Sequence, residues 1–268
     1  MAEIVADGLT AHHEDGVITW TLDAPSRRNA VNPEALAYIA AQCPKLTNEV
    51  VVLRGAGDEA FCAGFDLRAL GGPTPPATVD SAAAHASLPD AVLFAATRAM
   101  RQSEATLVAA IGGYAIGAGV ELACACDLRI ATHSTWFKIP AARLGVVYHA
   151  AGLATIRDVF GGAGAAQLLM LGRRIEAAAV LRTGGLIDVV AEEDLDSAVA
   201  AVIKDLRAAA PLSLSGNRRL LRALGDKTLD DKTLAEHSAA RVAAYASEDH
   251  REARTAVAER RSPRFTGR

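Results

Sequence analysis

The stretch that decides the fold reads Ile111–Gly112–Gly113–Tyr114–Ala115–Ile116–Gly117–Ala118–Gly119–Val120–Glu121–Leu122. The apolar run Leu107–Ile111 predicts a strand entering a tight glycine turn, and a helix is expected to follow over Ala118–Cys126. The first N–H groups of a helix lack internal partners and lie at the positive end of its dipole, so they can face an anion. Small residues at 117–119 leave that approach open. The pattern indicates a phosphate cradle, an oxyanion hole, or only a tight turn in which Glu121 complements the dipole.

A second turn of the same kind narrows these alternatives. Phe61–Cys62–Ala63–Gly64–Phe65–Asp66–Leu67 follows the buried strand predicted at Val50–Leu53. Two such turns can each donate one backbone N–H to the same oxygen, which is how a developing thioester enolate is stabilised. The chain has neither GxxxxGK[ST] nor a clean GxGxxG with a ribose-binding acid downstream, so nucleotide binding is disfavoured.

Strands and helices alternate at first and give way to helices alone, which predicts an α/β core with an all-helical C-terminal region. We place the core at residues 1–205 and the helical region at 206–268. The further elements expected are strands Val17–Leu22, Leu128–Ala131 and Leu186–Val190, and helices from the N-cap Asn32 to about Cys43, Ala83–Met100, Ala163–Leu171, Glu176–Leu181 and Lys232–Arg261.

Composition and charge exclude several classes of protein. The 268 residues are 51% hydrophobic and 22% charged, which is typical of a globular chain and excludes disorder. A net charge of -3 gives no electrostatic case for nucleic acid. The stretch Leu107–Cys126 is long enough to span a membrane, but Glu121 and its glycines favour the strand–turn–helix interpretation, so no membrane partner is expected.

The cysteines point to a reducing compartment rather than to a metal. No spacing resembles CxxC and no histidine cluster stands nearby, so no zinc site is expected. Met1–Thr10 has no apolar signal-peptide core, which favours free buried thiols and a cytoplasmic location. The four cysteines are Cys43, Cys62, Cys124 and Cys126.

Taken in this order, the two turns resemble those of the crotonase superfamily, the enoyl-CoA hydratase/isomerase family. The loop Pro25–Val31, the pair Cys126–Asp127 and the ending Arg260–Phe265 extend the resemblance over nearly the whole chain. The resemblance implies a crotonase-like spiral of ββα units, whose helical C-terminal region packs subunits into a homo-trimer or a hexamer. It also implies an acyl-CoA thioester substrate, of the kind met in fatty acid metabolism. Coenzyme A is then part of the substrate, and neither a separate cofactor nor a metal is implied.

The resemblance also implies roles for particular residues. The oxyanion hole would be formed by the backbone N–H groups of Phe65 and Ala118. For the two arginines of the N-terminal loop a solvated turn remains an equal interpretation, and for the basic tail a solvated helix face. The residues expected to bind CoA or substrate are Arg27, Arg28, Ala63, Gly64, Asp66, Leu67, Gly117, Ala141 and Arg264.

The sequence departs from the hydratases of this family at one position. They use two glutamates, and the first corresponds to Glu121, but the second is replaced by Ala141, which cannot move a proton. Hydration needs a base to activate water and an acid to protonate Cα. Tyr148 and His149 follow closely, and His149 matches a position where dienoyl-CoA isomerases carry a catalytic aspartate. Either His149 acts as a base near neutral pH, or both residues only shape the acyl pocket.

Three functions remain open at this stage. The first is hydration or isomerisation of an acyl-CoA, with Glu121 as acid and base. The second is decarboxylation or hydrolysis on the same scaffold, because loss of CO₂ forms the enolate without a second carboxylate. The third is non-catalytic acyl-CoA binding, which does not explain the carboxylate of Glu121.

The C-terminal helix carries an apolar stripe that a monomer would expose, which independently predicts an oligomer. Its members are Leu234, Val242, Ala243, Tyr245 and Val257.

Overall fold

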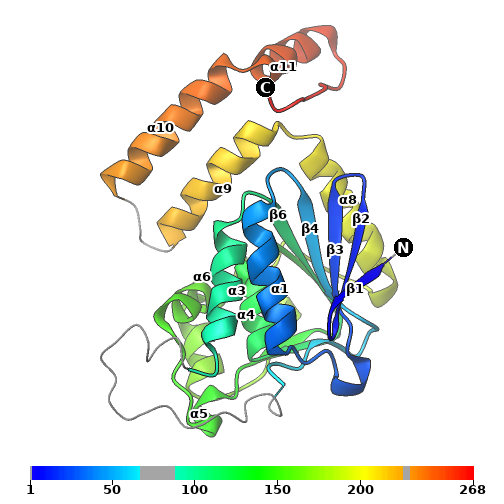
Figure 1. Cartoon of the computed structure of the whole chain (residues 1–268), viewed down its shortest axis with the longest axis vertical. Coiled ribbons are helices and arrows are strands. Elements are labelled where there is room, and N and C mark those ends of the chain that lie inside the picture. The colour runs from blue at the N-terminus through cyan, green and yellow to red at the C-terminus, as the bar shows by residue number, and fades with distance from the viewer. Residues whose placement is uncertain (1, 67–87, 226–229) are drawn as a thin grey trace.

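The main structural layer is a seven-stranded sheet, shown in Figure 1. The computed structural model describes residues 2–66, 88–225 and 230–268. The strand order in the sheet is β1-β2-β3-β4-β6-β8-β11, antiparallel at the N-terminal edge and parallel from β3 onward. The strands are β1 (Glu3–Ala6), β2 (Leu9–Glu14), β3 (Val17–Leu22), β4 (Val50–Gly55), β6 (Thr106–Ile111), β8 (Leu128–Thr132) and β11 (Asp188–Val190).

A four-stranded sheet of order β10-β9-β7-β5 lies beside the first. Its strands are β5 (Ala60–Cys62), β7 (Tyr114–Ile116), β9 (Trp136–Lys138) and β10 (Ile175–Glu176). A strand of the large sheet, a strand of the small sheet and a helix follow one another three times: β4, β5 and α3 (Ala91–Gln102); β6, β7 and α4 (Ala118–Ala125); and β8, β9 and α5 (Ala141–Leu144). This repetition is the spiral of ββα units that the resemblance to the crotonase superfamily implies.

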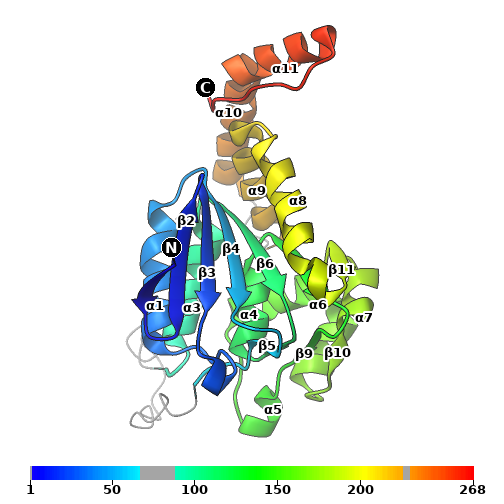
Figure 2. The same cartoon turned by 90° about the vertical axis from the view of Figure 1, so that its right-hand side faces the viewer.

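Alternation along the central strands divides the core between the two faces of the large sheet. Val51 and Leu53 of β4 belong to the main core, whereas Val52 between them packs with Leu195 and Val199 of α8. Helices α1 (Pro33–Gln42), α3 and α4 cover the main-core face, and α8 (Leu195–Arg207) covers the other, as Figures 1 and 2 show. Both faces of β4 are buried, which explains why its sequence is continuously apolar.

The remaining helices follow the last ββα unit. They are α6 (Ala150–Leu169), α7 (Ala177–Arg182), α9 (Pro211–Gly225), α10 (Asp231–Ala246) and α11 (Glu248–Glu259). Asp127 ties α9 to the core: its carboxylate lies 2.7 Å from Arg222 Nη2 and accepts a 2.9 Å hydrogen bond from the Leu107 N–H. The Asp127 side chain thus caps the strand junction and also holds the C-terminal region.

Several predicted elements are confirmed. Asn32 caps α1 through a 2.8 Å hydrogen bond from the Ala35 N–H. The strands at 17–22, 50–53, 107–111 and 128–131 and the helix at 118–126 lie within one or two residues of their predicted bounds. The strand expected at Leu186–Val190 is the shorter β11, and the helix expected at Glu176–Leu181 is α7.

Two helix predictions are wrong in their bounds. The expected single helix over 232–261 is two helices, because the extended backbone of Ser247 (ψ 159°) separates them and its side chain caps α11. The helix expected at Ala163–Leu171 is the second half of α6, which begins at Ala150 and kinks at Gly161, where φ is 70°. The helix expected from Ala83 is described only from Ala91, since 67–87 lie outside the described residues.

Candidate active site

The two glycine-rich turns lie against each other because β5 and β7 pair in parallel. At Gly119 a Cβ would stand 2.7 Å from both the Cβ and the carbonyl oxygen of Cys62, so only glycine allows this approach. Gly64 adopts φ +106°, and a Cβ there would lie 3.1 Å from the Ile116 carbonyl oxygen. Both turns therefore need glycine where they meet.

The backbone around Phe65 turns the Phe65 N–H away from the adjacent segment of the same chain, which pairs with it at Val31. The Val31 N–H donates to the Gly64 carbonyl at 2.9 Å, and the Asp66 N–H donates to the Val31 carbonyl at 2.8 Å. In such a parallel bridge the intervening residue turns its own N–H to the opposite side. Ala118 is the first residue of α4, where the N–H lies ahead of the intrahelical hydrogen bonds. Phe65 and Ala118, the residues whose amides are predicted to share an oxyanion, both line one cavity.

Asn29 fixes the N-terminal loop to the first turn. It is buried at a left-handed φ of 56°, a conformation that asparagine tolerates better than most residues. Its side-chain amide donates to the carbonyls of Ala56 and Ala60 at 2.9 and 2.7 Å. The Ala63 N–H in turn donates to the Arg28 carbonyl at 3.0 Å. Residues 24–31 and 63–66, which come from separate predicted motifs, therefore form one surface.

The two arginines of this loop differ in availability. Arg27 lies between Asp7 and Asp66, with N–O distances of 3.0 and 3.6 Å. Arg28 is the more exposed and pairs at 3.0 Å with Glu59, which is itself exposed. A phosphate could compete more easily for Arg28, because exposed ion pairs contribute little to stability. Leu67, the last residue of the predicted CoA segment, lies outside the described residues.

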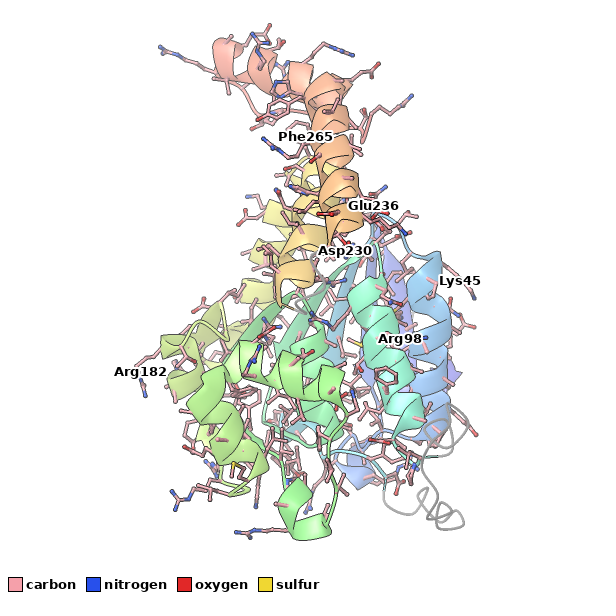
Figure 3. All side chains as sticks on the ribbon, turned by 90° about the vertical axis from the view of Figure 1, so that its left-hand side faces the viewer. Lys45, Arg98, Arg182, Asp230, Glu236 and Phe265 are labelled. Atoms are coloured by element: carbon pink, nitrogen blue, oxygen red, sulfur yellow. The ribbon has the colours of Figure 1, made fainter. Side chains whose placement is uncertain are left out.

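The tail that carries Arg264 is remote from this surface within one chain. The Arg264 N–H donates to Glu252 Oε1 at 2.8 Å. Helix α5, which lines the cavity described below, and the C-terminus lie at opposite ends of the molecule in Figure 1, and Figure 3 labels the neighbouring Phe265 among the last helices. A contact between Arg264 and CoA stays a prediction, and it would need a second copy of the chain.

Glu121 and His149 form a close pair beneath the turns. The distance between Glu121 Oε1 and His149 Nε2 is 2.6 Å, and the Thr97 hydroxyl donates to the same oxygen at 3.3 Å. Glu121 is only 2% exposed, so its side-chain contacts are desolvated. Both residues are candidates predicted from the sequence, whereas their contact is seen only in the structure.

The position of His149 at the start of α6 sets its tautomer. Its Nδ1 accepts a 3.0 Å hydrogen bond from the Gly152 N–H, so the neutral ring carries its proton on Nε2 and donates to Glu121. Burial lowers the pKa of His149, but the hydrogen bond and the charge of Glu121 outweigh this and raise the pKa above its ordinary value of 6.5. His149 is therefore both a helix cap and the hydrogen-bond partner of a buried carboxylate.

A cavity of about 470 Å³ joins these features. Phe65 and Ala118 line it together with Glu121, and Ala141 lies where the second carboxylate of the hydratases was expected. Tyr148 also lines it, and burial, reinforced by the charge of Glu121, raises the pKa of its hydroxyl far above the ordinary value. Tyr148 therefore stays protonated and can donate a hydrogen bond, but it is not a base. The remaining predicted members of this cavity wall are Ala63, Gly64 and Gly117.

The structure also identifies residues that the sequence analysis missed. Thr97 contacts Glu121 across two helices, which no local pattern indicates. Gly152 leaves room for the Glu121–His149 pair, and its position three residues after a capping side chain was a readable signal.

The described residues contain no group of three or more side chains suited to hold a metal. Among the same residues, no helix is long and apolar enough to cross a membrane.

All four cysteines fall within the described ranges, where they are buried and unpaired. Burial raises the pKa of Cys43, Cys62 and Cys124 to about 12, so these thiols stay protonated near neutral pH.

The spiral of ββα units, with two apposed turns above a buried carboxylate, defines a protein of the crotonase fold. The profile of the enoyl-CoA hydratase/isomerase family matches residues 12–268, and the chain belongs to this family. It is therefore an enzyme of the hydratase/isomerase type that acts on acyl-CoA.

Curated relatives and solved structures agree with this assignment. The chain is 30% identical to (E)-benzylidenesuccinyl-CoA hydratase of Thauera aromatica, over 92% of this chain and 94% of the relative. It is 32% identical to carnitinyl-CoA dehydratase of Proteus mirabilis, over 82% of each chain. An enoyl-CoA hydratase/carnithine racemase structure from Magnetospirillum magneticum superposes with a TM-score of 0.84 at 31% identity, covering 98% of this chain and 96% of that chain.

Proposed function

We propose that this enzyme adds water to an α,β-unsaturated acyl-CoA, using the Phe65 and Ala118 amides to hold the thioester oxygen and Glu121 to transfer protons. The observation that carries the proposal is the 2.6 Å contact between Glu121 Oε1 and His149 Nε2 beside the cavity. A carboxylate held by a histidine N–H is oriented for proton transfer, as in other catalytic constellations.

One carboxylate is sufficient for the whole addition. Glu121 accepts a proton from water while the water oxygen bonds to Cβ and the double-bond electrons move to the thioester oxygen. The two amides stabilise the resulting enolate, and the enolate then takes the same proton from Glu121 at Cα. Among the described residues, both side-chain hydrogen bonds to Glu121 fall on Oε1, so Oε2 is the oxygen assigned to this transfer.

His149 supports this step without leaving Glu121. Its Nε2–H compensates the carboxylate charge, and its Nδ1 is already engaged with the Gly152 N–H. We therefore assign to Glu121 and His149 together the proton transfer that the hydratases share between two glutamates, the second of which corresponds to Ala141 here. The same carboxylate and amides would also serve isomerisation, by removing a proton from one carbon and returning it to another.

The CoA half is assigned to the surface formed by the N-terminal loop and the first turn. Arg28, together with Arg27, would meet the CoA phosphates, while Ala63 and Asp66 would lie along the adenine and pantetheine. CoA enters as part of the substrate, and the mechanism requires neither a separate cofactor nor a metal.

We further propose that the enzyme works in the cytoplasm as a homo-trimer or a hexamer. The support for assembly is a set of exposed apolar side chains on the C-terminal helices: Leu221 (69%), Leu234 (44%), Val242 (70%), Tyr245 (66%) and Val257 (78%). Light scattering tests this proposal, because a species near the chain mass of 27.9 kDa would contradict it.

The function is tested with a panel of CoA thioesters. Crotonyl-CoA should lose its conjugated absorbance and gain one water, as mass spectrometry of the product would establish. Release of CO₂ from a malonyl-type thioester, or of free CoA, with no hydration would favour the decarboxylase or hydrolase alternative. Binding of every thioester without turnover would favour a non-catalytic role.

A further inference from the structure

The cavity that holds Glu121 carries a second carboxylate, which the proposed mechanism does not use. Asp90 lines it, and the other walls of the acyl end are apolar or uncharged. No lysine, arginine or histidine is present among the described lining residues. The apolar residues of the lining include Leu88, Leu93, Ile116, Leu144 and Val147.

Asp90 lines the cavity, and its carboxylate makes no capping hydrogen bond to its own helix. Asp90 is the N-cap residue of α3, but its side chain makes no capping hydrogen bond; its backbone carbonyl accepts from the Phe94 N–H at 2.9 Å instead. An N-cap aspartate ordinarily accepts a backbone N–H through its side chain. This carboxylate therefore remains half-buried beside the cavity.

The charge of Asp90 affects the pKa values of Tyr148 and His149. After burial and the charge of Glu121, Asp90 further raises the pKa of Tyr148, and it also raises the pKa of His149. Two negative groups thus act on a space with apolar walls, where charges interact more strongly than in water. An acyl group that carries its own carboxylate would meet repulsion, because the described group beside Glu121 that can carry a positive charge, His149, is already paired with that glutamate.

We propose that Asp90 makes the acyl end of the cavity selective for neutral or cationic acyl groups and against anionic ones. This inference rests on the proposed function, because it assumes that the acyl chain occupies this cavity. The selectivity would also distinguish a hydratase from a decarboxylase, because the malonyl-type substrates of a decarboxylase carry the disfavoured negative charge.

Binding of saturated thioesters tests the proposal independently of turnover. Dissociation constants are measured by calorimetry for butyryl-CoA, glutaryl-CoA and 4-trimethylammoniobutyryl-CoA, which share the CoA half and differ in terminal charge. The wild type should bind glutaryl-CoA about tenfold or more weakly than butyryl-CoA. Asp90→Asn should narrow this ratio by about fivefold or more and should weaken the cationic thioester.

Asp205→Asn is the matched control, because it removes the same charge from an exposed position on α8 and should leave all three constants unchanged. Equal binding of the anionic and neutral thioesters by the wild type would overturn the inference while the proposed function stands. An unchanged ratio in Asp90→Asn, with the fold retained by circular dichroism, would overturn it too. Absence of binding for all three thioesters would overturn the proposed site together with this inference.

Discussion

The imidazole of His149 occupies the space that a side chain at position 152 would need. A Cβ on Gly152 would stand 2.9 Å from His149 Cε1 and 3.1 Å from Glu121 Cδ. The same glycine donates its N–H to His149 Nδ1 at 3.0 Å. Gly152 therefore leaves space for the Glu121–His149 pair and also fixes the tautomer of His149.

Gly152→Ala should consequently separate the pair. We expect kcat to fall about tenfold or more while KM for the CoA thioester changes little, because the CoA surface is untouched. Gly162→Ala in the same helix is the control, since no described atom outside the adjoining helix backbone lies within 4 Å of its added Cβ. Steady-state kinetics that give the two variants equal activity would contradict the role assigned to Gly152.

The pH dependence of stability reports on His149. Its pKa is raised in the folded enzyme, since Glu121 outweighs the opposing effect of burial. The protonated ring therefore stabilises the fold fully below its ordinary value of 6.5, and this contribution is lost as the pH rises through the raised value.

His149→Asn isolates that contribution, because asparagine can still cap α6 but cannot titrate. The Tm of the wild type, relative to His149→Asn, should decline as the pH rises above the ordinary value of 6.5 and through the raised pKa of His149. If the difference in Tm between the two proteins stays constant as the pH rises, the contact with Glu121 does not raise the pKa of His149.

Ala141→Glu would supply the second carboxylate that the resemblance to the hydratases implies. Ala141 is buried in the cavity wall, so the new group would face the reacting centre. Repulsion between two nearby carboxylates raises the pKa of one and leaves an acid beside a base. Hydration of crotonyl-CoA should rise above the wild-type rate.

Ala142→Glu is the matched control, because Ala142 is exposed and is outside the described cavity wall. It should leave the rate unchanged. No gain from Ala141→Glu, with the fold intact, would mean that the pocket serves a different reaction, and the decarboxylase or hydrolase alternative would then be favoured.

Asp127→Asn should destabilise the enzyme without altering its site. Asp127 neutralises Arg222 at 2.7 Å, and both side chains are nearly buried. Removing one partner leaves a buried guanidinium charge uncompensated, which costs about 3 kcal/mol. Urea unfolding measures this loss, with the exposed Glu193→Gln as control. A loss no larger than that of the control would contradict the structural role.

A feature of the fold or of the site could be predicted from the sequence when the residues that form it lie close together along the chain. The turn at 111–122 was readable because glycine spacing and apolar runs are local signals. The contact between Glu121 and His149 spans 28 residues and exists only after the spiral brings α4 beside α6. Asn29 gave no signal of its own, because its hydrogen bonds reach Ala56 and Ala60 on another unit.

The break at Ser247 was different, because a local signal existed. Ser247 precedes Glu248 and Asp249, an N-cap followed by acids in the first helical turn. The alanine-rich periodicity on both sides concealed it. The apolar stripe assigned to one helix is therefore divided between α10 and α11, and how it meets a partner remains a prediction.

The central claim is that Glu121 moves the proton, and Glu121→Gln tests it most directly. Glutamine keeps the shape of the side chain but cannot transfer a proton, so turnover of crotonyl-CoA should fall by about 10²–10⁴-fold. The dissociation constant of butyryl-CoA, measured by calorimetry, should change little. Hydration by Glu121→Gln at the wild-type rate, with unchanged thioester binding, would contradict the account.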